Sequence, residues 1–306
     1  MQIYLPIAEL SLNVFGLLGL GVVVGFLSGL FGIGGGFLLT PLLIFIGVPH
    51  AVAVSTHANQ LIAASASGAL AHWRRNAVDF RMGLVMLLGG FVGSTLGVWL
   101  FKALSRIGQI ELVISLSYVV VLGLVGLLML SESGISMLRQ RRKAPPKPRA
   151  GRHPYWVRVL PFRMRFYRSR IYISALVPFV VGMFVGVLVA IMGVGGGFIM
   201  VPAMIYLLGM PTAVVTGTSL FQIVVITANV TFLQALTTQT VDVVLALILM
   251  IGGVLGAQVG ARTGGYLKGE QVRGLLALLL LAVAGKLLYD LVVTPADLYS
   301  ISRGGS

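Results

Sequence analysis

Long apolar runs, separated by short polar or glycine-rich stretches, extend from residue 10 to residue 292. An uncharged run of about 18 to 20 residues can cross a bilayer as a helix. Several runs approach or exceed that length, so we predict an all-α polytopic membrane protein. The expected segments are 10–31, 37–47, 51–72, 82–101 and 111–131, followed by 171–192, 198–208, 212–237, 241–262 and 271–292.

Two glycine-rich breaks interrupt this pattern and repeat each other. Gly-Ile-Gly-Gly-Gly-Phe at 32–37 returns as Gly-Val-Gly-Gly-Gly-Phe at 193–198, 161 residues later, and a proline follows each break. A period this long indicates duplication of a whole half-domain rather than a solenoid. The apolar segment after each break holds about 11 residues, or roughly 16 Å of helix, which predicts a half-helix.

The basic residues orient the chain, because twelve of the 22 Lys and Arg residues lie within 139–170. The positive-inside rule places this linker in the cytoplasm. Each half has five segments, an odd number, so we predict two inverted repeats of about five membrane segments each, as in many secondary transporters. If both glycine-broken segments re-enter instead of crossing, the repeats are parallel.

These features predict the domain organisation. It consists of a first membrane repeat at 10–131, a basic cytoplasmic linker at 132–170, a second membrane repeat at 171–292 and a short tail at 293–306. The start of the chain lacks a basic n-region, and the first apolar run lacks an obvious small-residue cleavage site. We therefore expect that run to be retained as a helix.

Composition narrows the class of protein further. Of the 306 residues, 58% are hydrophobic and 10% are charged. Few soluble folds could bury that much apolar surface. The net charge of +14 is concentrated in the linker, so we predict no nucleic-acid partner. The linker at 139–170 is suited instead to anionic head groups of membrane lipids. The chain has no cysteine, which excludes disulfides and thiolate chemistry.

The acidic residues point to the charge of the substrate. All eight lie in predicted loops or near segment ends, and none lies in the middle of a span. A cation transporter usually needs a carboxylate there, so an anion is favoured. Asp79 and Asp242 match each other and open the fourth helix of each half, where N-capping explains them. We predict no metal site, no cofactor and no enzymatic activity, because neither metal-ligand spacing nor a nucleophile with its base and acid is present.

The glycine breaks are the first part of the predicted substrate site. They lack the Lys-Ser/Thr of a phosphate-binding loop, and no strand precedes them, so a nucleotide site is disfavoured. Tight helix packing is one explanation. We favour another, in which free backbone N–H groups at the start of each half-helix bind an anion from opposite sides near the midplane. The glycines concerned are Gly34, Gly35, Gly36, Gly195, Gly196 and Gly197.

Polar faces just downstream are the second part of that site. Hydrogen-bonding side chains in a membrane helix are expected to face protein or a water-filled cavity. Helix-to-helix hydrogen bonds are the alternative to substrate binding. His57 adds a group that can titrate near an anion site and couple transport to protons. The predicted substrate-binding residues are Thr56, His57, Asn59 and Gln60 in the first half, and Thr218, Ser219 and Gln222 in the second.

The paired motifs resemble the TauE/SafE sulfite exporter family, also called the toluene sulfonate uptake permease family. The similar features are the two glycine breaks with their prolines, the stretches 51–56 and 213–219, the Arg-Arg-Asn-Ala-Val-Asp loop at 74–79 and the glycine-rich fourth helices. The resemblance covers about 15–131 and 173–290. It implies an inner-membrane transporter of bacteria or archaea for sulfur-containing anions such as sulfite, thiosulfate or sulfonates.

Two departures from the family pattern concern the substrate. The Thr-Gly-Thr-Ser at 216–219 reads Val-Ser-Thr-His at 54–57, and the basic linker is longer than the family leads us to expect. The function predicted is secondary transport of a small sulfur-containing anion by alternating access. The alternatives are an anion channel of the same architecture, a transporter of a different small organic anion, and a scaffold that acts through the linker. The coupling ion, a proton or sodium, and the oligomeric state stay open.

Overall fold

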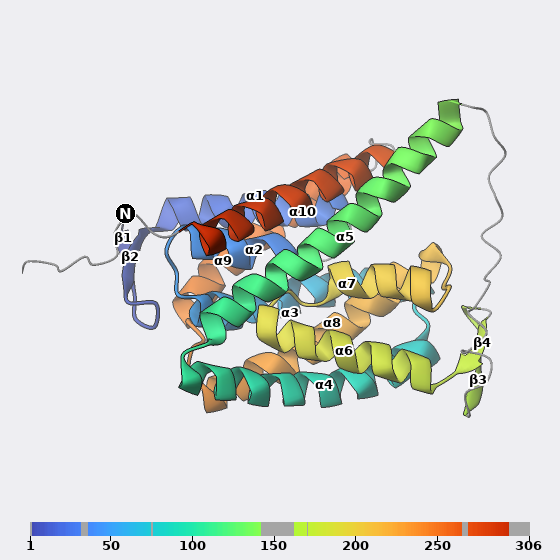
Figure 1. Cartoon of the computed structure of the whole chain (residues 1–306), viewed down its shortest axis with the longest axis horizontal. Helices are drawn as coiled ribbons and strands as arrows, with labels where there is room; N and C mark the ends of the chain where they lie inside the picture. Colours follow the sequence, from blue (N-terminus) through green and yellow to red (C-terminus); the bar gives the residue numbers. More distant parts are fainter. Residues whose placement is uncertain are drawn as a thin grey trace, which may run out of the picture.

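The computed structural model describes residues 2–31, 36–74, 76–141, 162–169, 171–264 and 269–293 (Figure 1). It is mostly helical, as predicted. The first half contains α1 (Val14–Phe31), α2 (Gly36–Phe45), α3 (His50–Arg74), α4 (Phe80–Ile107) and α5 (Ile110–Arg141). The second half contains α6 (Leu176–Met192), α7 (Gly197–Pro202), the π-helix η2 (Ala203–Leu207), α8 (Thr212–Thr237), α9 (Val243–Gly264) and α10 (Gly269–Val292).

Among the residues that the structure describes, five helical stretches are long and apolar enough to cross a membrane. They are Phe80–Ile107, Ile110–Ser131, Val214–Thr237, Val243–Gly260 and Gly274–Val292. Val14–Leu30, Leu176–Met192 and Gly197–Leu207 are shorter apolar helices. The polytopic helical architecture is therefore present, while the number of crossings and their inversion stay predictions.

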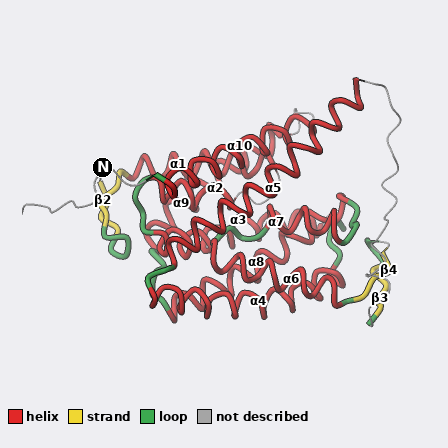
Figure 2. Tube along the Cα trace, in the orientation of Figure 1, coloured by secondary structure: helices red, strands yellow, loops and turns green. Residues whose placement is uncertain are grey.

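Two β-hairpins correct the prediction of an all-α chain. Strands β1 (Gln2–Leu5) and β2 (Leu10–Asn13) pair antiparallel, as do β3 (Arg163–Phe166) and β4 (Ile171–Ser174). The two hairpins lie at opposite ends of the helical bundle (Figures 1 and 2).

The hairpins also shift two helix starts away from the predicted ones. The helix expected from residue 10 begins at Val14, and the helix expected from residue 171 begins at Leu176. Asn13 accepts a hydrogen bond from the Phe15 N–H at 3.0 Å, and Ser174 accepts one from the Leu176 N–H at 3.3 Å. Short polar side chains of this kind favour helix entry over helix interior.

The short helix after the second break also differs from the predicted half-helix at 198–208. It is α-helical only from Gly197 to Pro202, and continues as the π-helix η2. Pro202 has no N–H to donate to the preceding turn, and π-turns are common where the regular ladder is interrupted.

Helix pairs that cross between the halves build the core. The first helix of each half packs on the fourth helix of the other, α1 on α9 and α6 on α4, and α3 packs on α8. Glycines allow the close approach. A Cβ on Gly25 would lie 2.2 Å from the Gly253 carbonyl oxygen, and one on Gly186 would lie 2.4 Å from the Gly90 carbonyl oxygen. Small residues permit this kind of backbone contact between membrane helices.

Candidate functional site

The second glycine break lies in the interior of the protein, against α3. Residues 193–197 are all buried. Gly193, Gly195 and Gly196 have φ values of +69°, +68° and +71°, in the left-handed region that favours glycine. A Cβ on Gly193 would lie 2.4 Å from the Val54 carbonyl oxygen, and one on Gly195 would lie 2.5 Å from Leu61 Cδ1. Both backbone conformation and space therefore require glycine here.

The break leaves backbone donors without partners in the described main chain. The Gly193 N–H donates to the Val189 carbonyl at 2.8 Å and ends α6. The Gly196 carbonyl accepts from the Ile199 and Met200 N–H groups and starts α7. Between them, no carbonyl of the described residues accepts a hydrogen bond from the backbone N–H groups of 194–198. Gly195, Gly196 and Gly197 lie within this stretch, and their predicted role in binding an anion stays a prediction.

The first break can be followed only in part. Gly34 and Gly35 lie outside the described residues, and Gly36 is the first residue of α2. The two phenylalanines that follow the breaks meet in the core, since the ring centroids of Phe37 and Phe198 are 5.7 Å apart. The starts of α2 and α7 are therefore neighbours.

Thr56 and Thr218 each contact the opposite half. The Thr56 hydroxyl accepts a hydrogen bond from the Asp242 N–H at 3.0 Å, and the Thr218 hydroxyl accepts one from the Asp79 N–H at 3.0 Å. Both threonines are fully buried. The predicted polar faces thus supply helix-to-helix hydrogen bonds in this conformation.

Asp79 and Asp242 are N-caps, as predicted. Asp79 Oδ1 accepts from the Met82 N–H at 3.2 Å, and Asp242 Oδ1 accepts from the Leu245 N–H at 3.0 Å. The second oxygen of each carboxylate holds a hairpin. Asp79 Oδ2 accepts from the Ser169 N–H at 3.0 Å, and Asp242 Oδ2 accepts from the Ile7 N–H at 3.3 Å.

Like the two threonines, Gln60 connects α3 to α9, and Gln222 connects α8 to α4. Gln60 Nε2 donates to the Leu249 carbonyl of α9 at 3.1 Å, and Gln222 Nε2 donates to the Gly83 carbonyl of α4 at 3.3 Å. The Oε1 atom of Gln222 is buried and has no hydrogen-bond partner among the described residues. Gln222 Oε1 is therefore an unpaired acceptor in the interior of the bundle.

The remaining predicted residues occupy the same two helices. Ser219 Oγ donates to the Thr216 carbonyl of its own helix at 2.9 Å, and Asn59 is half-buried on α3. His57 is buried, and its Nδ1 lies 2.8 Å from Thr40 Oγ1 on α2. Adjacent residues of α3 therefore contact α2 through His57 and α9 through Thr56.

Sequence analysis missed two residues of the site, Thr40 and Tyr118. The Tyr118 hydroxyl donates to the Met192 carbonyl at 2.7 Å, and the Thr40 hydroxyl lies 2.8 Å from Nδ1 of His57. In the sequence, Thr40 is a single polar residue within an apolar run, and Tyr118 follows Ser115 and Ser117 in another run. Met192 immediately precedes the second break, so Tyr118 reaches it directly.

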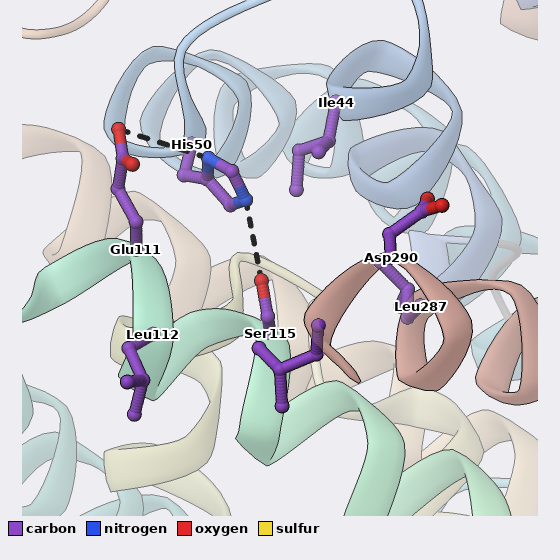
Figure 3. Close-up of a pocket in the computed structure, with 8 residues that line it drawn as sticks. Ile44, His50, Glu111, Leu112, Ser115, Leu287 and Asp290 are labelled. Carbon is purple, nitrogen blue, oxygen red and sulfur yellow. Dashed lines mark hydrogen bonds and ion pairs between the residues drawn. The ribbon is translucent and has the colours of Figure 1, made fainter. Parts of the chain in front are cut away.

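A separate pocket of about 340 Å³ lies where α3 and α5 begin and α10 ends (Figure 3). Its lining includes His50, Glu111, Ser115 and Asp290. His50 Nε2 lies 3.2 Å from Ser115 Oγ, and His50 Nδ1 lies 3.9 Å from a Glu111 carboxylate oxygen. None of the predicted substrate-binding residues lines this pocket.

Comparison with known proteins gives one family. The profile of the family described as "Sulfite exporter TauE/SafE" matches residues 17–287. A "Probable membrane transporter protein" of Xylella fastidiosa (strain 9a5c) is 32% identical over 252 residues, which cover 79% of this chain and 82% of that protein. The "Probable membrane transporter protein YunE" of Bacillus subtilis (strain 168) is 26% identical over 285 residues, 89% of this chain and 96% of that protein. No solved structure matches the chain.

Proposed function

Because the chain belongs to the sulfite exporter TauE/SafE family, we propose that it carries small sulfur-containing anions, such as sulfite, thiosulfate or sulfonates, by alternating access. The family and the bacterial homologues make it a multi-pass membrane transporter and not an enzyme. The class of substrate and the mechanism are the parts that we propose.

The observation that carries the proposal is the buried break at 193–197. Successive backbone N–H groups in a turn conformation form concavities that attract anions. Here the N–H groups of 194–198 have no acceptor among the described carbonyls, and apolar side chains lie next to Gly195 and Gly196. In such surroundings an N–H group interacts more strongly with a negative charge than it does in water. We propose that Gly34, Gly35 and Gly36 supply the matching donors from the first half.

The repeated contacts between halves support an inverted arrangement. Thr56 with Asp242 and Thr218 with Asp79 make the same contact in exchanged roles. The hairpin contacted by Asp242 and the hairpin contacted by Asp79 lie at opposite ends of the bundle (Figure 1). Two halves related in this way can expose one central site to each side in turn.

We propose that the polar faces bind substrate when the site opens. In the present conformation Thr56, Gln60, Thr218 and Gln222 hold α4 and α9. Moving those helices would free these hydroxyl and amide groups to donate hydrogen bonds to the anion. His57, Asn59 and Ser219, on the same two helices, complete the proposed set. A proton or sodium ion would couple the movement to an ion gradient.

The protein is proposed to reside in the inner membrane of a bacterial or archaeal cell, with the basic linker in the cytoplasm. The end of the linker that the structure describes is rich in arginine. The guanidinium carbons of Arg81 and Arg165 lie 5.0 and 5.9 Å from the centre of the Tyr167 ring. Arginines gathered beside an exposed aromatic ring suit the anionic head groups of the cytoplasmic leaflet.

A ligand panel tests the class of substrate. Purified protein is heated with sulfite, thiosulfate, sulfate, a sulfonate or a simple carboxylate at matched ionic strength. A ligand at a hundred times its Kd stabilises the folded state by about 2.7 kcal/mol, which is measurable as a shift in Tm. We expect a shift with a sulfur oxyanion and none with carboxylates. A shift with carboxylates alone would replace the proposed substrate with another organic anion.

Counterflow distinguishes a carrier from a channel. Liposomes loaded with unlabelled substrate should accumulate labelled substrate transiently, because a carrier exchanges one for the other at a single site. An open pore would show no such accumulation, and that result would favour the anion channel.

A further inference from the structure

Ser65, in α3, carries a buried hydroxyl that the described fold does not use. The residue is fully buried, and its Oγ has no hydrogen-bond partner among the described residues. A hydroxyl in a helix commonly donates to a carbonyl three or four positions earlier. The hydroxyls that do so on α3 and α8 include those of Ser55, Thr218, Thr227 and Thr237. Ser65 therefore presents a donor that neither its own helix nor a described neighbour satisfies.

Ser65 lies on the face of α3 that packs against the second break and α8. Residues three or four apart share one face of a helix, so Leu61, Ser65 and Gly68 lie together. A Cβ on Gly195, in the break, would lie 2.5 Å from Leu61 Cδ1. A Cβ on Gly68 would lie 2.9 Å from Leu220 Cδ1 of α8. Ser65 is therefore placed between a contact with the break and a contact with α8.

The break itself advances along α3 toward Ser65. A Cβ on Gly193 would meet Val54, whereas one on Gly195 would meet Leu61, about two turns further along α3. Ser65 follows Leu61 by one turn on the same face. The backbone N–H groups that follow Gly193 in the break have no acceptor among the described carbonyls. Two kinds of unsatisfied donor, a hydroxyl and backbone N–H groups, are thus gathered beside one stretch of α3.

The surroundings of these donors are apolar and uncharged. Leu61, Leu220 and Ile223 form a buried cluster at the contact of α3 with α8. Helices α2, α6 and α8 contain no Asp, Glu, Lys or Arg, so none of their side chains offers a carboxylate to the donors. A hydrogen bond to an anion is stronger in such surroundings than in water.

We infer that the Ser65 hydroxyl donates a hydrogen bond to the transported anion and so belongs to the site at the second break. This inference rests on the proposed function. A sulfur oxyanion has several acceptor oxygens, so one oxygen can meet the hydroxyl while others meet N–H groups. Thr56 and Thr218 must leave their contacts with Asp242 and Asp79 before they can bind an anion. Ser65 is available without that movement.

Thr227 occupies the equivalent position in the second half and behaves differently. It lies 162 positions after Ser65, the same offset that separates Gln60 from Gln222. The Thr227 hydroxyl donates to the Ile223 carbonyl at 2.6 Å. A free hydroxyl is therefore a property of Ser65 and not of this helix position. We expect the two hydroxyls to contribute unequally to anion binding.

The missing partner fixes the sign of the first measurement, the stability of the protein without an anion. A buried donor without an acceptor destabilises a fold. Ser65→Ala removes that donor, so the variant should be as stable as the unaltered protein or more stable. A hydroxyl that holds the fold together would give the opposite sign. Thermal unfolding in detergent, with no anionic ligand added, compares the two proteins.

Anion binding is the second measurement, with sulfite, thiosulfate and methanesulfonate as separate probes at matched ionic strength. For the probe that binds the unaltered protein most tightly, Ser65→Ala should raise Kd by about tenfold, because a hydrogen bond to a charged group is lost. Ser65→Cys keeps a weak donor and should give an intermediate Kd. Thr227→Val is the matched control, and should leave Kd unchanged because the Thr227 hydroxyl donates within α8.

Two results would overturn this inference alone. One is an unchanged Kd in Ser65→Ala, and the other is a clear loss of stability of Ser65→Ala without an anion. If the unaltered protein bound none of the three probes, the proposed function would fail, and the inference with it.

Discussion

The hydroxyl of Thr56 accepts a hydrogen bond from the backbone N–H of Asp242 at 3.0 Å, across 186 positions of sequence. Its counterpart Thr218 does the same for Asp79 at 3.0 Å. Each threonine therefore holds the start of the fourth helix of the opposite half. The position of each fourth helix therefore depends on the other half, because a threonine of that half accepts a hydrogen bond from the N-cap residue of the helix.

Replacing Thr218 with Val should destabilise the protein. The variant leaves the buried Asp79 N–H without its acceptor, and an unsatisfied buried donor costs about 1 to 3 kcal/mol. Thr56→Val should cost a similar amount for the same reason. Reversible unfolding in mixed detergent micelles, followed by circular dichroism, measures the free energy of unfolding of each variant.

Thr227→Val is the matched control for this prediction. Thr227 is also buried on α8, but its hydroxyl donates only within its own helix, to the Ile223 and Val224 carbonyls. Its loss should cost less than about 1 kcal/mol, because those carbonyls also belong to the helix ladder. Equal effects of Thr218→Val and Thr227→Val would contradict a role for Thr218 between the halves.

Gly195→Ala should disable transport. Ala at a φ of +68° costs about 1 to 2 kcal/mol, and its Cβ would lie 2.5 Å from Leu61 Cδ1. Both effects displace the N–H groups on which the proposed anion site depends. We expect flux into liposomes to fall by more than about tenfold, equivalent to about 1.4 kcal/mol, and the ligand-induced shift in Tm to disappear.

Gly123→Ala serves as the control for Gly195→Ala. A Cβ on Gly123, in α5, would meet nothing within 4 Å, so flux should not change. If Gly195→Ala folded and transported like Gly123→Ala, the break would have no part in anion binding.

The sequence was sufficient to predict the long helices, because a long apolar run is a property of local composition. The hairpins were missed because β2 runs directly into α1 within one apolar stretch, and strands of four residues are too short for a hydropathy window. Residues 10–13 form a strand and not a first turn of α1 because they pair with β1. That pairing is a tertiary contact, and local composition does not encode it.

The partners of the polar side chains were beyond sequence reasoning. Thr56 and Thr218 were identified as important, but their acceptor role toward Asp242 and Asp79 depends on helix packing between the halves. The contact of Tyr118 could not be predicted either, because its partner is the carbonyl of Met192, 74 positions away. Every residue has a backbone carbonyl, so the sequence does not distinguish the one that accepts.

Gly25→Ala should separate α1 from α9. Its Cβ would lie 2.2 Å from the Gly253 carbonyl oxygen, a backbone atom that cannot rotate away. Overpacking of this kind costs about 1 to 3 kcal/mol. Gly186→Ala should cost a similar amount at the equivalent contact of α6 with α4. Gly19→Ala, also in α1 but with nothing within 4 Å, should leave the free energy of unfolding nearly unchanged. Equal stability of the Gly19 and Gly25 variants would contradict the helix pairing.

Single cysteines can decide whether the two repeats are inverted. The chain has no cysteine, so each variant carries one thiol for a membrane-impermeant maleimide. Asn76 and Gln239 occupy matching positions in the loops before α4 and α9. Both are exposed and have positive φ values, 57° and 52°, so cysteine meets the same backbone at each. Inverted repeats place them on opposite sides of the membrane.

We expect Gln239→Cys to react in intact cells and Asn76→Cys to react only after permeabilisation. Gln109→Cys, in the exposed loop between α4 and α5, should behave like Gln239→Cys, because His50 contacts Glu111 and Ser55 contacts Thr240 at the same end of α3. Reaction of Asn76→Cys and Gln239→Cys from the same side would make the repeats parallel. In that case one central site could not be reached by exchanging the roles of the two halves, and alternating access would need a different movement.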